Sequence, residues 1–260
     1  MNELQQAFEN RGKTKVFIPF IVGGFPDLAT TEELILALAE CGADIIKIAI
    51  PFSDPVAEGP IMQAANEQAL AAGCTVDGLF DVISRVRKKV TVPIIFMSYL
   101  NPIFVYGKDR FMAECKNSGI DGIIVPDLPY EERLELAEHC AKYGITQISV
   151  IAPTSGERIA TIVKEAEGFI YCMATLNANE KGESDLNVAE MVAAAKAVTD
   201  KPCVLCVEVS DYLELPNSIG VCDGITIGSD IVKLVTEYGK SCVQPVRKFV
   251  EKVVENGNVR

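Results

Sequence analysis

The chain repeats one pattern along most of its length: a short apolar run, a turn and an amphipathic helix. Eight apolar runs occur, and helical stretches lie between them. Near-continuous apolar strands that alternate with helices are typical of a parallel sheet covered on both faces. Eight such units in 260 residues predict an α/β fold, a (β/α)8 TIM barrel with extra helices, as a single domain over 1–260. An open doubly wound sheet is the alternative, but no Gly-x-Gly-x-x-Gly turn follows the first strand.

The boundaries follow from the apolar runs and from helix-capping residues. Strands are predicted at 16–21, 44–50, 93–99, 122–125, 147–151, 168–173, 202–207 and 224–227. Helices are predicted at 30–40, 75–88, 108–117, 130–143, 157–166, 187–198 and 229–238, with extra ones at 62–72 and 243–254. The first dozen residues read as a short amphipathic helix that has Leu4 and Phe8 on one face.

Composition argues against several classes of protein. The formal net charge of −12 disfavours a nucleic-acid partner, because binding to that backbone depends on clustered Lys and Arg. No apolar run is long enough to cross a membrane, and the first residues do not resemble an export signal. We therefore expect a cytoplasmic protein whose nine cysteines are reduced. The strand period puts Cys203 and Cys206 on opposite faces, which favours core packing over a metal or redox pair.

One charged residue interrupts an apolar strand. Lys47 lies in the run Ile-Ile-Lys-Ile-Ala-Ile at 45–50, and burial of an ammonium is costly and lowers its pKa. In a barrel of this kind the chemistry lies at the carboxyl ends of the strands, and Lys47 lies near such an end. The only histidine, His139, belongs to a predicted helix surface. No catalytic triad and no metal site are expected as a result.

Several separated motifs follow one another along the chain. The longest is Ile-Pro-Phe-Ser-Asp-Pro-Val-Ala-Glu-Gly-Pro at 50–60, and shorter ones lie at 17–20, 42–44, 99–104, 106–107, 125–129, 168–171 and 228–229. Through these motifs, over essentially its full length, the chain resembles the α-subunit family of tryptophan synthase. The resemblance implies a barrel without a cofactor that cleaves indole-3-glycerol phosphate into indole and glyceraldehyde 3-phosphate by a retro-aldol step. It also implies docking on a pyridoxal-phosphate β subunit that receives the indole.

The resemblance assigns two catalytic positions, and both have changed. Lys47 stands where the family has its acid/base glutamate, and an ammonium cannot accept a proton unless its pKa falls. Glu58 stands where the family has an aspartate that stabilises the protonated indole, so its carboxylate is displaced by about an ångström. Two interpretations of Lys47 stay open. Its ammonium pairs with Glu58 or Asp127 after loss of function, or its amine attacks a carbonyl to form a Schiff base.

Substrate-binding positions are kept only in part. At the family's phosphate site Gly228 and Ser229 remain, but Glu208 replaces a glycine. A carboxylate about 4 Å from a phosphate charge costs roughly 1 to 4 kcal/mol per pair of charges. Asn179, followed by Glu180, stands where the loop that closes over the substrate has a threonine and a glycine. The sequence thus predicts a phosphate site with added negative charge.

Four further residues complete the predicted site. Phe20, Tyr99 and Tyr171 follow or end predicted strands and are interpreted as pocket-wall residues, with core packing as the alternative. Asp127 follows the fourth strand, where it either shapes the turn or lies beside the pocket.

Three functions stay open on this basis. The chain is an α subunit with relaxed motifs, or a diverged carbon–carbon lyase or aldolase that uses Lys47 and Glu58 on another, less anionic small molecule. The third is a non-catalytic member that binds the β subunit or a ligand. We expect an enzyme of this lyase class in which cleavage of indole-3-glycerol phosphate is strongly reduced.

Overall fold

The computed structural model describes residues 3–11, 14–173, 187–207 and 220–255. Parallel strands alternate with helices along this part of the chain, as the sequence predicts. The strands are β1 (Val16–Val22), β2 (Ile46–Ala49), β3 (Ile94–Met97), β4 (Gly122–Ile124), β5 (Thr146–Gln147), β6 (Ser149–Ile151), β7 (Ile170–Cys172), β8 (Cys203–Val207) and β9 (Gly224–Ile227).

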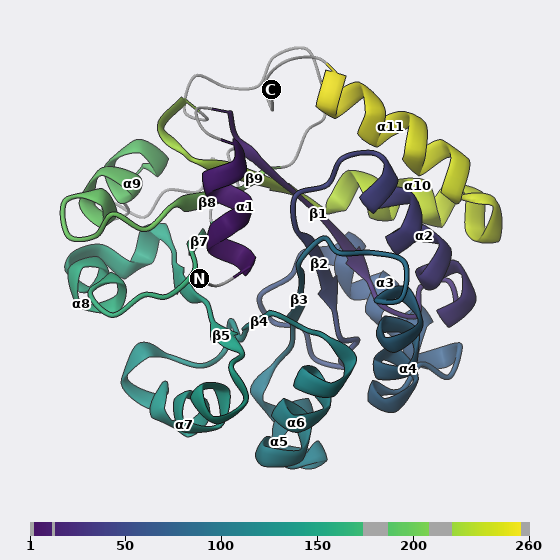
Figure 1. Cartoon of the computed structure of the whole chain (residues 1–260), viewed down its shortest axis with the longest axis horizontal. Coiled ribbons are helices and arrows are strands. Elements are labelled where there is room, and N and C mark those ends of the chain that lie inside the picture. The colour runs from purple at the N-terminus through teal and green to yellow at the C-terminus, as the bar shows by residue number, and fades with distance from the viewer. Residues whose placement is uncertain (1–2, 12–13, 174–186, 208–219, 256–260) are drawn as a thin grey trace.

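The strands form one parallel sheet in the order β5-β4-β3-β2-β1-β9-β8-β7-β6. Its two outermost members, β5 and β6, are consecutive in the sequence and are separated only by Ile148. They are two halves of one strand, because β5 pairs with β4 and β6 pairs with β7. This divided strand brings the two edges together, so the sheet is a nearly closed barrel (Figure 1). The predicted (β/α)8 barrel is confirmed.

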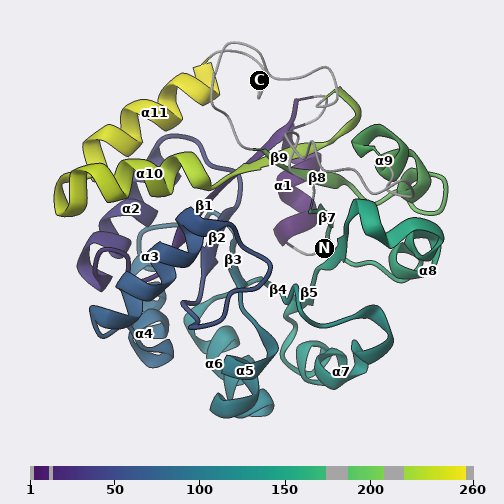
Figure 2. The ribbon, with the colours of Figure 1, turned by 180° about the vertical axis from the view of Figure 1, so that it is seen from behind.

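Helices surround the barrel, and Figure 2 shows this outer layer from behind. The α-helices are α1 (Glu3–Arg11), α2 (Leu28–Glu40), α3 (Pro60–Ala71), α4 (Val76–Val86), α5 (Leu100–Tyr106), α6 (Lys108–Ser118), α7 (Leu134–Tyr143), α8 (Ile159–Val163), α9 (Val188–Lys196), α10 (Ser229–Tyr238) and α11 (Val243–Glu255). Three short 3-10 helices are η1 (Tyr130–Glu132), η2 (Pro153–Arg158) and η4 (Gly239–Ser241). Among these elements, none is a helix both long enough and apolar enough to span a membrane.

Helix α1 lies across the centre of the ring in both views (Figures 1 and 2). Leu4 is fully buried, and one of its methyl groups lies 3.0 Å from the point that a Cβ on Gly122 would occupy. Phe8 packs against Phe169 with ring centroids 5.7 Å apart. Gly122 begins β4 and Phe169 directly precedes β7, so α1 covers the amino-terminal end of the barrel. The carboxyl ends of the strands lie at the opposite end.

The structure has one helix that the sequence does not predict. No helix is predicted between the strand at 93–99 and the helix at 108–117, but residues Leu100–Tyr106 form α5. Pro102 lies in the first turn of α5, where a backbone N–H has no partner within the helix, so proline is tolerated there. The free N–H of Leu100 instead donates to both carboxylate oxygens of Asp127, at 3.0 and 3.2 Å. A side chain from the next strand end thereby caps this helix.

Candidate active site

Lys47 lies inside the barrel with 0% of its surface exposed. Strand register places it beside Phe20 of β1 and Ile95 of β3, and residues in register on parallel strands point to the same face of the sheet. Its Nζ donates a hydrogen bond of 2.5 Å to the Tyr171 hydroxyl on β7, across the barrel. The same nitrogen lies 3.8 Å from the centre of the Phe20 ring and 4.2 Å from that of Tyr171. The amine is thus held between two aromatic faces.

No carboxylate forms an ion pair with Lys47 among the residues that the structure describes. The expected pair with Glu58 is absent at the 4.0 Å limit for an ion pair, and the Asp127 carboxylate caps α5 instead. Burial lowers the pKa of Lys47 from 10.5 to about 8, while the charges of Cys206 and Glu58 act in the opposite direction. Aromatic faces stabilise an ammonium less than a carboxylate does. The described residues therefore give Lys47 no ion pair, and the choice between its two interpretations stays a prediction.

Glu58 is held on the loop after β2 by two neighbouring elements. Its Oε2 accepts a hydrogen bond of 2.9 Å from the Nδ2 of Asn66 on α3. Tyr99, at the end of β3, also hydrogen-bonds to Glu58, and its hydroxyl accepts from the Ala57 N–H at 3.0 Å. Burial raises the pKa of Glu58, while the Asn66 hydrogen bond and the Lys47 charge act in the opposite direction. Glu58 is therefore positioned near Lys47 without contacting it.

The phosphate side of the predicted site is described in part. Phe20 is buried, and a Cβ on Gly228 would lie 2.6 Å from its ring, so the close approach requires glycine at this position. Ser229 begins α10, whose first turn follows β9 directly. Asn179 and Glu208 lie outside the described residues. The structure thus brings together Lys47, Phe20 and Tyr171 in one group and Glu58 and Tyr99 in a neighbouring one, whereas Asp127 serves α5.

Three further residues lie near the site. The sequence favours core packing for Cys206, yet Cys206 is partly exposed and affects the pKa of Tyr171. Thr226 on β9 is in register with Cys206. Its Oγ1 is the only side-chain N or O atom with no hydrogen-bond partner among the buried, described ones. Asn66 lies on the buried face of α3. Asn66 and Thr226 are polar residues at positions where the sequence pattern expects apolar ones, and this departure was the signal that could have identified them.

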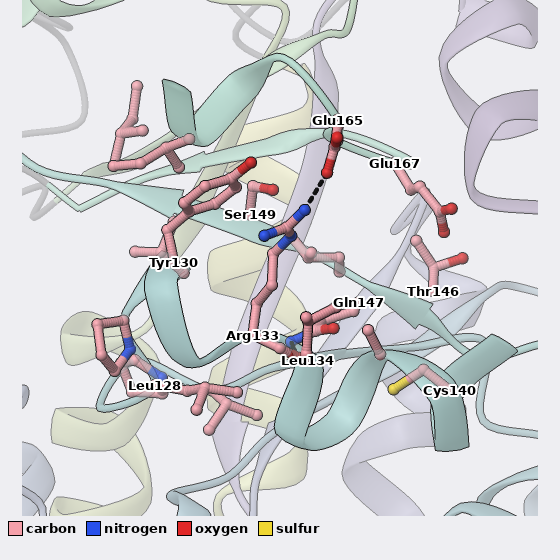
Figure 3. Close-up of a pocket in the computed structure, with 18 of the residues that line it drawn as sticks. Leu128, Tyr130, Arg133, Leu134, Cys140, Thr146, Gln147, Ser149, Glu165 and Glu167 are labelled. Atoms are coloured by element: carbon pink, nitrogen blue, oxygen red, sulfur yellow. Dashed lines mark hydrogen bonds and ion pairs between the residues drawn. The ribbon is translucent and has the colours of Figure 1, made fainter. Parts of the chain in front are cut away.

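A separate groove of about 720 Å³ lies between α7 and α8, outside β5 and β6 (Figure 3). Gln147 and Ser149 line it from the strands, and an ion pair between Arg133 and Glu165 crosses it. No predicted site residue with a described position lines this groove. It is therefore distinct from the group around Lys47. The described residues also contain no cluster of His, Cys, Asp and Glu that could hold a metal ion.

Comparison with known proteins gives a consistent result. The family model described as tryptophan synthase alpha chain matches residues 6–258. The tryptophan synthase alpha chain of Lacticaseibacillus casei is 41% identical over 254 residues, covering 97% of this chain and 94% of the relative. That of Alkaliphilus metalliredigens is 39% identical, covering 94% and 93%.

Solved structures agree. The crystal structure of tryptophan synthase subunit alpha from Legionella pneumophila superposes with a TM-score of 0.85 at 28% identity, covering 97% of both chains. A chain of Mycobacterium tuberculosis tryptophan synthase gives a TM-score of 0.88 at 26% identity, covering 100% of this chain and 99% of the other.

Proposed function

The chain belongs to the tryptophan synthase alpha chain family, and from this premise we propose that it cleaves indole-3-glycerol phosphate far more slowly than its relatives do. The observation that carries the proposal is the state of Lys47. With a pKa of about 8, its side chain is mostly an ammonium at neutral pH. An ammonium has no lone pair with which to take the proton that the family's glutamate accepts.

The neighbouring carboxylate does not replace the missing base. Glu58 is committed to hydrogen bonds with Asn66 and Tyr99, and its side chain lies beyond ion-pair distance of Lys47. Glu208, a glycine position in the family, adds negative charge on the phosphate side according to the sequence alone. Both changes disfavour the developing charges of the family reaction.

Docking on a β subunit is the second part of the proposal. Four large apolar side chains are exposed on segments that follow the carboxyl ends of β2, β3 and β4: Val56, Phe104, Val105 and Leu134. Val56 and Val105 are 79% and 77% exposed. Large apolar side chains exposed at one rim are consistent with a protein interface. This rim is the end of the barrel at which indole would leave.

A lyase that acts on another small, carbonyl-forming substrate through Lys47 is a second candidate function. The direct contact between the Lys47 amine and the Tyr171 hydroxyl favours it. In this reading the barrel and the β-subunit rim are retained while the substrate has changed.

Indole release from indole-3-glycerol phosphate tests the first proposal. The rate of the purified chain should be at least about 100-fold below that of the L. casei alpha chain assayed alongside, which is the usual effect of losing a general base. Both proteins should be assayed with and without a β subunit, because the proposed docking rim is the end of the barrel that carries the site. A rate within a few-fold of the relative's would overturn the proposal. The double substitution Lys47→Glu and Glu208→Gly should raise the rate.

Docking is tested separately with Val105→Asp in a pull-down with a β subunit. The substitution should abolish binding, because an interface core does not tolerate an unpaired carboxylate. Val198→Asp is the matched control, since Val198 is an exposed valine that follows α9, at the other end of the barrel. Equal binding by both variants would argue against docking through this rim.

A further inference from the structure

The Lys47 amine lies inside the barrel, and no carboxylate of the described residues lies within ion-pair distance of it. The only hydrogen bond that its Nζ makes among the described residues goes to Tyr171. A structural lysine in a protein interior is normally paired with a carboxylate. From the placement of these two groups we propose that Lys47 is an amine nucleophile that forms an imine with a small uncharged aldehyde or ketone, and that Tyr171 transfers the protons.

The surroundings favour a neutral amine. Both ring faces and the burial of the side chain disfavour hydration of an ammonium, and the pKa of Lys47 falls to about 8 as a result. Roughly a tenth of the amine is then unprotonated at pH 7, compared with less than about 0.1% for an ordinary lysine. A nucleophilic lysine requires this kind of site, in which the free amine is populated.

Tyr171 is placed to carry protons to and from the reacting atoms. Its oxygen lies 2.5 Å from Nζ, and the Cys206 thiol on the neighbouring strand β8 is close enough to affect its pKa. Burial raises the pKa of Tyr171 well above its ordinary value, so the group keeps its proton until a stronger base forms beside it. The oxygen anion produced by attack on a carbonyl is such a base.

Thr226 supplies an independent indication that a ligand binds here. Its residue is fully buried, and its hydroxyl has no partner within the described part of the chain. It is in register with Cys206 and with Ile18, and Ile18 lies on the same face of β1 as Phe20. The hydroxyl therefore points into the barrel interior, as Lys47 does. A buried hydroxyl without a partner costs free energy, and a ligand oxygen would satisfy it.

The chemistry balances with these groups alone. The Nζ lone pair forms a bond to the carbonyl carbon, the carbonyl oxygen takes the Tyr171 proton, and the nitrogen returns a proton to the phenolate. The resulting carbinolamine then loses its hydroxyl group, which leaves as water with a second Tyr171 proton. The iminium gives its proton back to the phenolate, leaving an imine and an intact tyrosine. No oxidant, metal or cofactor is consumed.

The substrate class follows from what surrounds the amine. Phe20 and Tyr171 offer apolar faces, and Thr226 offers a single hydroxyl. Among the described residues, the Glu58 carboxylate acts on Lys47 through its charge, and it would repel an anionic carbonyl compound. Because Lys47 is fully buried, a compound of two or three carbons suits the site. This inference deepens the second candidate function and does not depend on whether indole-3-glycerol phosphate is cleaved.

Reductive trapping tests it on the full-length chain. Acetaldehyde and cyanoborohydride should attach one ethyl group at Lys47 ahead of all other lysines, as located by peptide mass spectrometry. The labelling rate should rise with pH up to about 8 and then level off, because the free amine is the reactant. Lys15→Arg is the matched control. Lys15 is another lysine whose burial lowers its pKa, and it lies just before β1, at the other end of the barrel. Labelling of Lys47 should persist in this variant.

Three results would overturn the inference. They are no label at Lys47 in the wild-type chain, an unchanged labelling rate in Tyr171→Phe, and faster labelling by glyoxylate than by acetaldehyde after correction for their rates on free lysine. The expected loss in Tyr171→Phe is about 100-fold in rate, with the same final extent of labelling, which a folding defect would not preserve. Indole release is measured separately. Rapid indole release together with a label at Lys47 refutes only the first proposal. If there is no indole release and no label at Lys47, only this inference is refuted.

Discussion

Two cationic side chains with little solvent exposure, Arg87 and Lys47, have contrasting sets of partners. Arg87, at the carboxyl end of α4, forms an ion pair with Asp121 and donates to the carbonyl oxygens of Gly119 and Val92 at 2.7 and 2.6 Å. Asp121 in turn accepts from the N–H of Ile94, which begins β3, at 2.8 Å. Lys47, on the neighbouring strand β2, is more deeply buried, and among the described residues it contacts one tyrosine hydroxyl and two aromatic rings.

The contrast separates a structural charge from a reactive one. Arg87 ties α4 to the segments that precede β3 and β4, and each of its hydrogen bonds supports the fold. The site of Lys47 leaves the cation poorly stabilised, which costs stability and yields a neutral amine near physiological pH. Groups held against their preferred state are typical of functional sites rather than of the core. The comparison can be tested by removing each charge in turn.

The largest effect is expected from Arg87→Met. It should destabilise the fold by about 4 kcal/mol, because the enclosed Asp121 carboxylate and two backbone carbonyls lose their partner. Arg85→Met is the matched control: Arg85 is half exposed and pairs with Glu32 at the surface, so its loss should cost less than about 1 kcal/mol. Urea unfolding at pH 7 measures the free energy of unfolding of both variants. Equal costs for the two variants would mean that Arg87 is no more structural than a surface residue.

A smaller effect of opposite sign is expected from Lys47→Met. Between pH 8 and 10.5 the unfolded chain binds the lysine proton and the folded chain does not, so the penalty of the wild type is full below about pH 8 and disappears by 10.5. The drop in pKa corresponds to a penalty on the order of 3 kcal/mol. The variant should be more stable by about that amount at pH 7, and the advantage should fade as pH rises. A difference that stays constant from pH 7 to 10.5 would show that Lys47 titrates normally.

The smallest effect is expected from two buried threonine hydroxyls, one without a hydrogen-bond partner among the described residues and one with two partners. Thr226→Val should stabilise the chain by about 1 kcal/mol, because it removes a buried hydroxyl without a partner. Thr31→Val should destabilise by a similar amount, since that fully buried hydroxyl accepts from Gly24 and donates to Asp27, both at 2.9 Å. Thermal unfolding of the two variants measures the difference. A loss of stability in Thr226→Val would contradict the inference that the Thr226 hydroxyl has no hydrogen-bond partner until a ligand binds.

Local pattern was sufficient to predict the barrel, because its strands and helices have distinct periodicities. It also identified Lys47 as anomalous, since a charge in an apolar strand is visible without a structure. The partner of Lys47 was not predictable: Tyr171 is 124 positions away, and only ring closure brings the two together. The same holds for Asp127, which accepts from the first N–H of α5, a helix that the sequence analysis does not predict. Pairwise side-chain geometry across the barrel was therefore the part that local reasoning missed.

The divided strand at Ile148 has a consequence for how the molecule opens. Only two residues of β5 are in register with β4, so the ring is joined there by fewer backbone hydrogen bonds than between β1 and its neighbours. The groove outside β5 and β6 also removes packing from the same place (Figure 3). Amide hydrogens of β5 and β6 should therefore exchange with deuterium earlier than those of β1 and β9. Local unfolding of the barrel should begin at this divided strand.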